Sequence, residues 1–282
     1  MAITNFIPEI WNSQLLVSFA QNAVAANLVN RSYEGDATKG NTVHITGAVD
    51  VEIKDYAAAN RITEADEIAD TGQELLIDQE KVFDFFVDDI DRAQASGSME
   101  AYTYTAGRSL AADADKFILA LAAAGDEDPA SGDLADGNAA HDVIRDLRKK
   151  LNKRHVPMGD RYLIVNAEFE AVLLGSDAKL TSVDVSGTPD GLREATLGRY
   201  LGFTVVTTEN LPETDAPMAI GLYGPAIAYV SQIEKTEAMR AQNKFADRLR
   251  GLHVYGGKVI RPEGIAVFNA GGGNGGGDNP SS

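Results

Sequence analysis

One long helical run constrains the fold of this chain more than any other feature of its sequence. Ser98 is suited to cap a helix N-terminus and Gly125 to follow a C-terminus. Between them, apolar side chains recur at helical spacing among many alanines: Met99, Tyr102, Ala106, Leu110, Phe117 and Leu121. We therefore predict a helix over 98–124. At about 26 residues it would be roughly 39 Å long, about twice the mean length in globular proteins, and would serve as a strut.

A polar insert separates two strand-like runs ahead of this helix. Residues 42–46 and 49–53 alternate in polarity with period two, and a second alternating run extends over 75–90. Between the two runs lie about 20 mostly polar residues, 54–74. An insert of this length is uncommon inside a compact domain and usually has a function. We predict a long hairpin that forms a charged arm reaching away from its own core.

The remaining segments mix helices and strands. Predicted helices cover 8–30, 141–155 and 167–175, and the run 234–250 is capable of forming a helix. Predicted strands cover 162–165, 203–207, 218–230 and 252–267. Loop-like stretches lie at 126–138 and 176–202, and 271–282 is a predicted flexible tail. Because helices and strands do not alternate as regular βαβ units, the predicted class is α+β.

Charge is strongly segregated along the chain. The formal net charge is −17, and residues 50–91 hold 14 acidic residues against three basic ones, a net charge of −11. The predicted helix 141–155 carries a basic cluster: Arg145, Arg148, Lys149, Lys150, Lys153 and Arg154. One interpretation is a solubilising surface with cations at a helix end, where the helix dipole favours them. The other is complementarity between copies, in which the acidic stretch of one copy lies on the basic helix of another.

No catalytic or cofactor motif is recognisable. The chain has no cysteine, which excludes disulfides and thiolate chemistry. Its histidines lack metal-ligand spacing, no apolar run of 18 residues is present, and the acidic balance disfavours tight nucleic-acid binding. The densest carboxylate group alternates between two strand faces, which favours a solvated sheet edge over a divalent metal site; it comprises Asp84, Asp88, Asp89 and Asp91. We expect a building block rather than an enzyme, with no cofactor.

Several stretches, taken in order and spacing, resemble one known family. They are residues 3–11, 40–45, 81–94, 156–166 and 197–212. In these stretches, and over nearly the whole chain to about residue 268, the sequence resembles the major capsid proteins of tailed bacteriophages with the Hong Kong 97-type fold.

The resemblance implies a division of the α+β chain into named parts. They are an N-terminal arm over 1–40, an extended E-loop over 41–82, a peripheral domain over 83–159 with its spine helix at 98–124, a mainly axial domain over 160–255, return strands of the peripheral domain over 256–270, and the tail 271–282. In this family the E-loop overlaps a neighbouring subunit. The acidic stretch would then be the E-loop, and the basic helix would be its partner on the next copy.

The resemblance also implies the function and the partners. The chain would self-assemble, as hexamers and pentamers, into the icosahedral shell that encloses the double-stranded DNA genome of a tailed phage, without sequence-specific DNA binding. A separate scaffolding protein and a portal would be partners, and no membrane would be involved. The subunit would assemble in the host bacterial cytoplasm and reside in the virion.

Ten residues are candidates for the subunit interface: Lys54, Arg61, Glu64, Asp66, Glu67, Arg148, Lys149, Lys150, Lys153 and Arg154. Three alternatives stay open at this point, of which a virion decoration or tail protein is disfavoured because such proteins rarely combine a long strut helix with so long an acidic arm. An encapsulin-type compartment shares the fold and would enclose enzymes instead of a genome, and an enzyme with an unrecognised site would behave as a monomer or small oligomer with a substrate-sized pocket.

Overall fold

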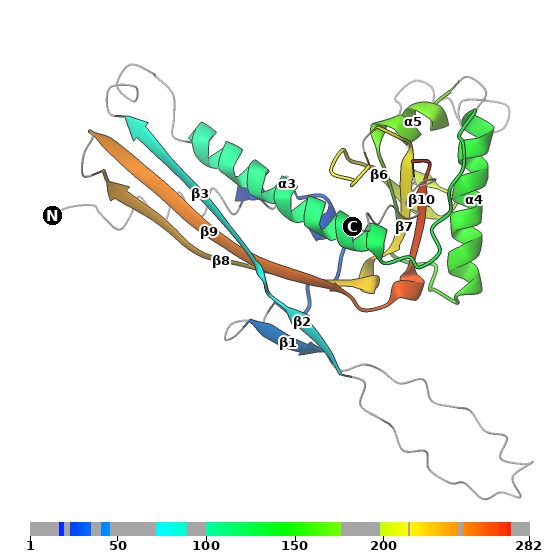
Figure 1. The fold of residues 1–282 in the computed structure, drawn as a ribbon, viewed down its shortest axis with the longest axis horizontal. Helices are drawn as coiled ribbons and strands as arrows, with labels where there is room; N and C mark the ends of the chain where they lie inside the picture. The colour runs from blue at the N-terminus through cyan, green and yellow to red at the C-terminus, as the bar shows by residue number, and fades with distance from the viewer. Residues whose placement is uncertain are drawn as a thin grey trace, which may run out of the picture.

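The chain folds into a long, narrow part and a more compact part (Figure 1). The structure is a computed structural model of the 282-residue chain. It describes residues 17–19, 23–34, 41–45, 72–88, 100–175, 198–213, 215–241 and 245–271. Within these residues it has the mixed helix and sheet content that the sequence predicts.

A three-stranded antiparallel sheet and one long helix form the narrow part. The strands are β3 (Gln79–Asp88), β9 (Ala246–Val259) and β8 (Ile227–Arg240), with β9 in the centre. Helix α3 (Glu100–Ala124) runs along one face of this sheet (Figure 1). Its residues Leu110, Ala114 and Ile118 are buried in one cluster with Tyr229 and Tyr255 of the sheet. The helix predicted over 98–124 is therefore confirmed from residue 100 onward.

The compact part is built on a five-stranded sheet. Its order is β10 (Ile265–Asn269), β7 (Met218–Tyr223), β4 (Arg161–Val165), β6 (Phe203–Thr207) and β5 (Arg199–Tyr200), and β4 and β6 are the parallel pair. Helices α4 (Gly137–Lys153) and α5 (Ala167–Leu173) cover one face. The opposite face buries Ile164, Ile220 and Leu222 in the cluster that includes α3. Both faces of this sheet are therefore buried, as the uniformly apolar sequence of β7 requires.

The C-terminal end of α3 meets this sheet closely. Gly125 follows the helix, and a Cβ there would lie 2.7 Å from the side chain of Ile265 on β10. A larger residue there would require the end of the Ile265 side chain to shift. The glycine identified from sequence as a helix stop therefore lies where the two parts of the molecule meet.

Short elements connect the rest of the chain. A two-stranded hairpin base is formed by β1 (Thr42–Ile45) and β2 (Gln73–Leu76), whose register runs from Thr42 opposite Leu76 to Ile45 opposite Gln73. The described residues also form the 3-10 turns η1 (Ala25–Asn27), η3 (Gly224–Ala226) and η4 (Pro262–Gly264). The hairpin predicted around the polar insert is confirmed at its base, and residues 46–71 lie outside the described residues.

The helix considered for 234–250 is wrong, and the helix predicted over 8–30 is wrong at 25–27. The run 234–250 forms parts of β8 and β9, although its Ala, Glu, Lys and Met content favours helix. Partners on both sides of β9 supply enough cross-strand packing to override that propensity. Within 8–30, residues 17–19 are helical, but 25–27 form a 3-10 turn. The backbone N–H groups of Val24 and Ala26 there bond to Asp115 of α3, which replaces helical hydrogen bonding.

The packing of the elements does not follow the sequence ranges expected for the domains. β8 and the greater part of β9 belong to the range 160–255, which was expected to be mainly axial, and they pair with β3 in the three-stranded sheet beside α3. Helix α4 belongs to the range 83–159, which was expected to be peripheral, and it packs on the five-stranded sheet instead of on α3.

Among the helices that the structure describes, none has the length and apolar character of a membrane span.

Candidate subunit interface

The root of the predicted arm is fixed firmly to the three-stranded sheet. Val43, Ile45 and Leu75 of the hairpin base are buried against Ala228 and Val230 of β8. The ladder of the hairpin itself continues one position beyond the strands, because the N–H of Ile77 donates to the carbonyl of Asn41 over 2.8 Å. The hairpin base therefore shares a hydrophobic core with the body of the subunit.

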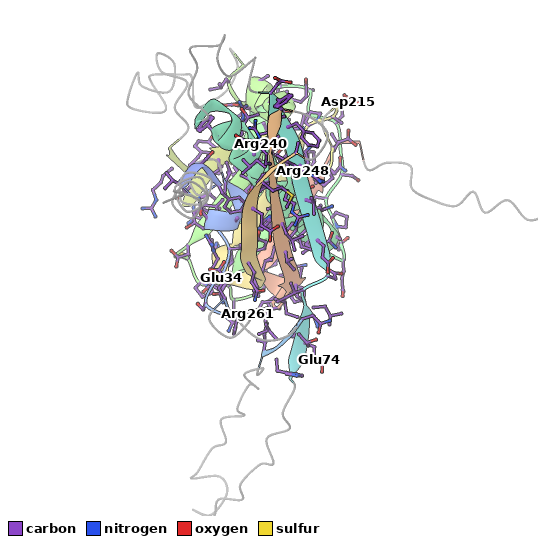
Figure 2. The ribbon with its side chains drawn as sticks, turned by 90° about the vertical axis from the view of Figure 1, so that its left-hand side faces the viewer. Glu34, Glu74, Asp215, Arg240, Arg248 and Arg261 are labelled. Atoms are coloured by element: carbon purple, nitrogen blue, oxygen red, sulfur yellow. The ribbon has the colours of Figure 1, made fainter. Side chains whose placement is uncertain are left out.

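Close backbone contact at Gly256 completes this attachment. A Cβ at Gly256 of β9 would collide with the carbonyl oxygen of Leu76. Next to it, the Lys258 ammonium donates to the carbonyl of Glu74 over 3.0 Å. Figure 2 shows Glu74 at the end of the molecule from which β2 projects, far from Arg240 and Arg248 at the other end of the sheet. The residues after Ile45 thus leave from a rigid base.

The N-terminal segment is attached to α3 by one buried carboxylate. Asp115 accepts the N–H of Val24 at 2.8 Å and that of Ala26 at 3.1 Å, and its side chain is fully buried. Burial raises the pKa of Asp115, and the backbone hydrogen bonds offset part of this effect. Asn30 then exchanges backbone bonds with β8, at Ile227 and Tyr229. The segment 23–30 is therefore held between α3 and β8.

The basic cluster of α4 divides into two functional groups. Lys150 and Arg154 point to Asp126, at 2.7 Å and 3.1 Å, and the Asp126 side chain is fully buried. Its carboxylate also accepts the N–H of Val267 on β10 at 2.9 Å. Burial alone would raise the pKa of Asp126, but these donors outweigh it and hold the pKa below its usual range. Lys150 and Arg154 thus join α4 to α3 and β10 within one subunit.

The other cations of the cluster differ among themselves, and Arg145 pairs with Asp142 and Asp146. Among the described residues, Arg148, Lys149 and Lys153 form no ion pair, and Lys149 and Lys153 are exposed. Arg148 is half-buried and lies against Gly202. Lys149 and Lys153 are one helical turn apart, so they form a positive stripe on the surface of α4.

The acidic half of the predicted interface lies outside the described residues. It consists of Glu64, Asp66 and Glu67, and the two cations Lys54 and Arg61 lie there as well. The pairing of this stretch with α4 of another copy therefore stays a prediction. Among its five basic residues, Lys150 and Arg154 have an ion-pair partner within the subunit, and Arg148, Lys149 and Lys153 have none among the described residues.

Of the carboxylates considered as a metal site, Asp84 pairs with arginine, whereas Asp89 and Asp91 lie outside the described residues. On the outer face of the three-stranded sheet, Asp84 accepts a bidentate bond from Arg248, and this pairing lowers the pKa of Asp84. Arg248 also lies over the ring of Phe86 at 5.6 Å, and Arg250 pairs with Glu237. In the part of the chain that the structure describes, no cluster of acidic or histidine side chains is suited to hold a metal ion. A ladder of ion pairs across β3, β9 and β8 stands there instead.

Sequence reasoning missed the roles of two buried aspartates. Asp115 is one of several acids on α3, and no local pattern marks it as the partner of the N-terminal segment. A signal for Asp126 did exist. It follows the helix stop Gly125 directly, and the cations of α4 require a nearby counter-charge.

Comparison with known proteins gives consistent results. A family model described as phage capsid protein matches residues 75–268. A solved structure of Mycobacterium phage Che8 shares 50% sequence identity and a TM-score of 0.77, covering 87% of this chain and 90% of its own. No curated protein matches the sequence.

More distant solved structures share the fold. The capsid structure of Cyanophage P-SCSP1u has 17% identity and a TM-score of 0.68, with 88% of each chain covered. The crystal structure of a virus-like particle from Pyrococcus furiosus has 14% identity and a TM-score of 0.59, covering 93% of this chain and 99% of that one. These matches confirm the α+β capsid fold that the sequence resemblance implied.

Proposed function

Because the chain belongs to the phage capsid protein family and is a major capsid protein, we propose that its copies join through the segment between β1 and β2 and the cations of α4. The family model covers well over half of the chain, and the phage structure at 50% identity covers nearly all of it. The encapsulin alternative is not favoured, since the matching family model is described as phage capsid protein and the structure at 50% identity is that of a phage.

The observation that carries the proposal is the rigid hairpin base. A segment of 27 residues between Ile45 and Gln73 departs from a base that shares the core of its own subunit. Seven acidic residues and two basic ones occupy positions 46–72, a net charge of −5. A segment held in this way can transmit load between subunits, because its root does not detach from the sheet.

The positive stripe of α4 is the proposed contact for these acids on the next copy. Lys149 and Lys153 are exposed and form no ion pair among the described residues, so their charge is available to a neighbour. Charge complementarity of this kind mainly sets the orientation and the rate of association. It is also screened by salt, so assembly is expected to weaken as ionic strength rises.

The remaining parts of the proposal follow from the family. The shell encloses double-stranded DNA without sequence-specific contacts, consistent with the net charge of −17. Hexamers and pentamers are the building units, and a separate scaffolding protein and a portal direct assembly in the host cytoplasm. The part with α3, β3, β8 and β9 is the peripheral domain, and the five-stranded sheet with α4 and α5 is the axial domain. Catalysis is no part of this role.

Electron microscopy of the purified chain tests the shell, and charge reversal tests the contact. Lys149→Glu with Lys153→Glu is expected to reduce shell yield and its salt dependence. The matched control is Lys116→Glu, since Lys116 is an exposed lysine of α3. Reversal of Lys150 is unsuitable, because it would break the ion pair with Asp126 inside the subunit. Equal shell yields for the double variant and its control would contradict the α4 contact.

A further inference from the structure

A buried histidine lies on the face of the three-stranded sheet that α3 covers. His253 of β9 is fully buried, and its Nε2 shares a hydrogen bond of 2.8 Å with the Oγ of Ser231 on β8. Its Nδ1 is also buried and has no hydrogen-bond partner among the described residues. Both nitrogens of an imidazole can form hydrogen bonds, so this ring is satisfied at one of them only.

The N-terminal segment covers this histidine. The ring of Phe19 meets the imidazole edge to face, with the ring centroids 5.2 Å apart, and Phe19 is itself buried. Next to it, the Oγ of Ser18 donates to the carbonyl of Tyr104 on α3 over 2.9 Å. The ring of Phe19 therefore keeps water from His253, and Ser18 holds this part of the segment against α3.

A second buried polar atom nearby has no partner. Tyr229 lies two positions before Ser231 on β8, so the two side chains share a face of the sheet. The Oη of Tyr229 is buried without a hydrogen-bond partner among the described residues. Its ring lies 6.0 Å from that of Tyr255, which in turn lies 4.8 Å from that of His253. Because buried polar atoms without partners are costly, water admitted to this face offsets part of the packing lost on opening.

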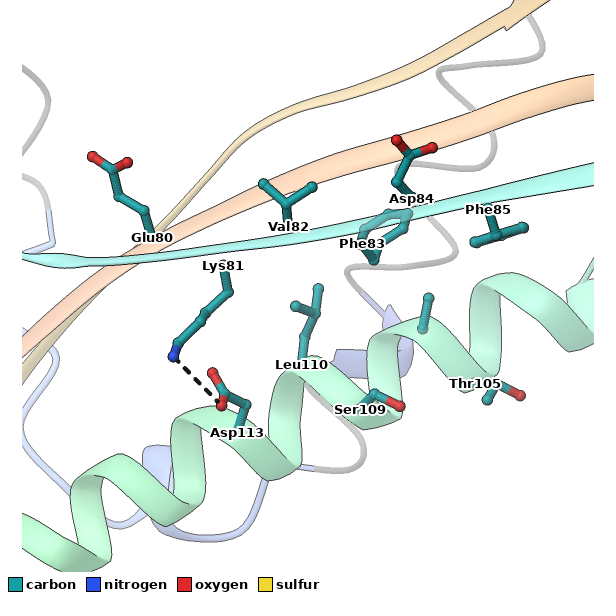
Figure 3. A pocket seen from close by; sticks show the side chains of 11 residues that line it. Glu80, Lys81, Val82, Phe83, Asp84, Phe85, Thr105, Ser109, Leu110 and Asp113 are labelled. Atoms are coloured by element: carbon teal, nitrogen blue, oxygen red, sulfur yellow. Dashed lines mark ion pairs between the residues drawn. The ribbon is translucent and has the colours of Figure 1, made fainter. Parts of the chain in front are cut away.

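The charged groups around His253 are engaged with one another. Lys81 of β3 lies directly opposite His253 in the sheet and reaches Asp113 of α3 at 3.9 Å (Figure 3). Asp113 also accepts the hydroxyl of Tyr255 over 2.6 Å. The charge of Asp113 favours a protonated His253, but burial outweighs it and lowers the pKa of His253 to about 4. Protonation thus places a charge and a second N–H where no acceptor is in reach.

We propose that His253 is an acid-sensitive switch, whose protonation releases residues 17–19 from the sheet while the rest of the subunit stays folded. Departure of Phe19 exposes the imidazolium to water, which supplies the acceptor that Nδ1 lacks in the closed state. The bonds from Val24 and Ala26 to Asp115 lie beyond this point and keep residues 23–30 attached.

The direction of the response follows from the pKa of His253 in the two states. It is about 4 in the closed state and returns toward the ordinary 6.5 once the ring is exposed, so acid favours release. With these values the ratio of released to closed segments rises at most about twentyfold between pH 7 and pH 5. Burial raises the pKa of Asp115, so acid disfavours its exposure. Because Asp115 stays buried in the released state, it does not oppose the switch.

A single engineered cysteine reports the release, because the native chain has no cysteine. Ser18→Cys preserves the size of a buried side chain next to Phe19. Its labelling by dithiodipyridine, which reacts with thiols at acid pH, is measured on the free full-length subunit at pH 7, 6 and 5. Ala140→Cys, at a fully buried position of α4, is the matched reporter for the compact part.

We expect the labelling rate of Ser18→Cys to rise about ten- to twentyfold from pH 7 to pH 5, relative to Ala140→Cys. Adding His253→Gln is expected to remove most of this rise. Adding His155→Asn is expected to leave it unchanged, because His155 is exposed and its φ of 56° suits asparagine. No rise for Ser18→Cys, an equal rise for both reporters, or a rise that persists with His253→Gln would overturn the switch.

A titration that keeps His253 covers the case in which His253→Gln does not fold. The imidazole signals of the four histidines are followed by NMR as the pH is lowered. We expect one histidine to titrate below the other three, and its midpoint to move toward about pH 6.5 in Phe19→Ala, which removes the covering ring. Four histidines that titrate together in the unchanged chain, or a midpoint that Phe19→Ala does not raise, would overturn the proposal.

Discussion

The two sheets of this subunit differ in how completely their own chain covers them. The five-stranded sheet is buried on both faces, by α4 and α5 on one side and by the α3 cluster on the other. The three-stranded sheet is covered by α3 on one face, and the hairpin base covers its outer face at Ala228 and Val230 of β8. Elsewhere on that outer face, the described residues leave Val82 at 66% exposure and Phe86 at 54%. One sheet is completed within the subunit, whereas the other leaves apolar surface of the kind that marks contacts with other proteins.

The largest effect is expected at the five-stranded sheet, where Asp126 joins α4 to β10. Asp126→Ala leaves the ammonium of Lys150 and the guanidinium of Arg154 without their buried counter-charge. Removal of one partner of a buried pair costs about 3–5 kcal/mol of unfolding free energy. Urea unfolding of the unassembled subunit measures it. Asp128→Ala is the control, because Asp128 is exposed and interacts with Lys150 through its backbone carbonyl; equal losses in the two variants would contradict the role of Asp126.

The second effect concerns the inner face of the three-stranded sheet and depends on pH. His253 is fully buried, and burial lowers its pKa to about 4 despite the nearby charge of Asp113. Its pKa in the unfolded chain is higher, so the stabilisation is complete above about pH 6.5 and is lost as pH falls toward 4. The full loss amounts to about 3 kcal/mol at 1.36 kcal/mol per pKa unit.

Unfolding midpoints in urea at pH 7, 6 and 5 measure this loss. His253→Gln is expected to be less stable at pH 7, because it disrupts the contact with Ser231, and to lose less stability between pH 7 and 5. A slope as steep as that of the unchanged chain would show that other groups cause the acid sensitivity.

A smaller loss of stability is expected where the N-terminal segment is hydrogen-bonded to α3. Asp115→Ala leaves the N–H groups of Val24 and Ala26 without their acceptor. Buried donors that lose their partner cost about 1–3 kcal/mol. Because the ionised form of Asp115 is itself disfavoured by burial, the loss is expected to be smaller near neutral pH than at acid pH. Thermal unfolding at two pH values measures it, and an equal or reversed difference would contradict this assignment.

The smallest effect is expected at the exposed end of the three-stranded sheet. Phe245, between β8 and β9, is 81% exposed, so Phe245→Ser should change the stability of the free subunit by less than about 0.5 kcal/mol. Urea unfolding measures this value, and electron microscopy of the same variant measures shell yield. A loss of several kcal/mol in the free subunit would contradict the claim that this end of the three-stranded sheet is not packed within the subunit.

Local patterns in the sequence predicted the elements that depend on local chemistry. The α3 helix was predictable because its periodicity and its stop signal Gly125 lie within one segment. The burial of Ile144, Leu147 and Leu151 on one face of α4 was predictable for the same reason. The fold class followed from the order of such segments.

Features that depend on distant partners were not predictable. The residues of 234–250 favour helix individually, and only pairing along β9 makes them strands. Similarly, the five candidate cations of α4 look equivalent in sequence. Asp126 separates Lys150 and Arg154 from the others because it lies more than 20 positions away and meets them only in the folded chain.

The continuity of β2 and β3 has a mechanical consequence. Residues 73–76 and 79–88 form successive strands of nearly one line, and β3 is paired with β9 along its whole length. A pull on the segment beyond β2 therefore acts parallel to β3, so the inter-strand hydrogen bonds resist together in shear instead of opening one after another. When internal pressure stretches a filled container, tension that reaches a subunit through this segment loads the sheet in shear. A sheet resists shear more strongly than the opening of its hydrogen bonds one after another.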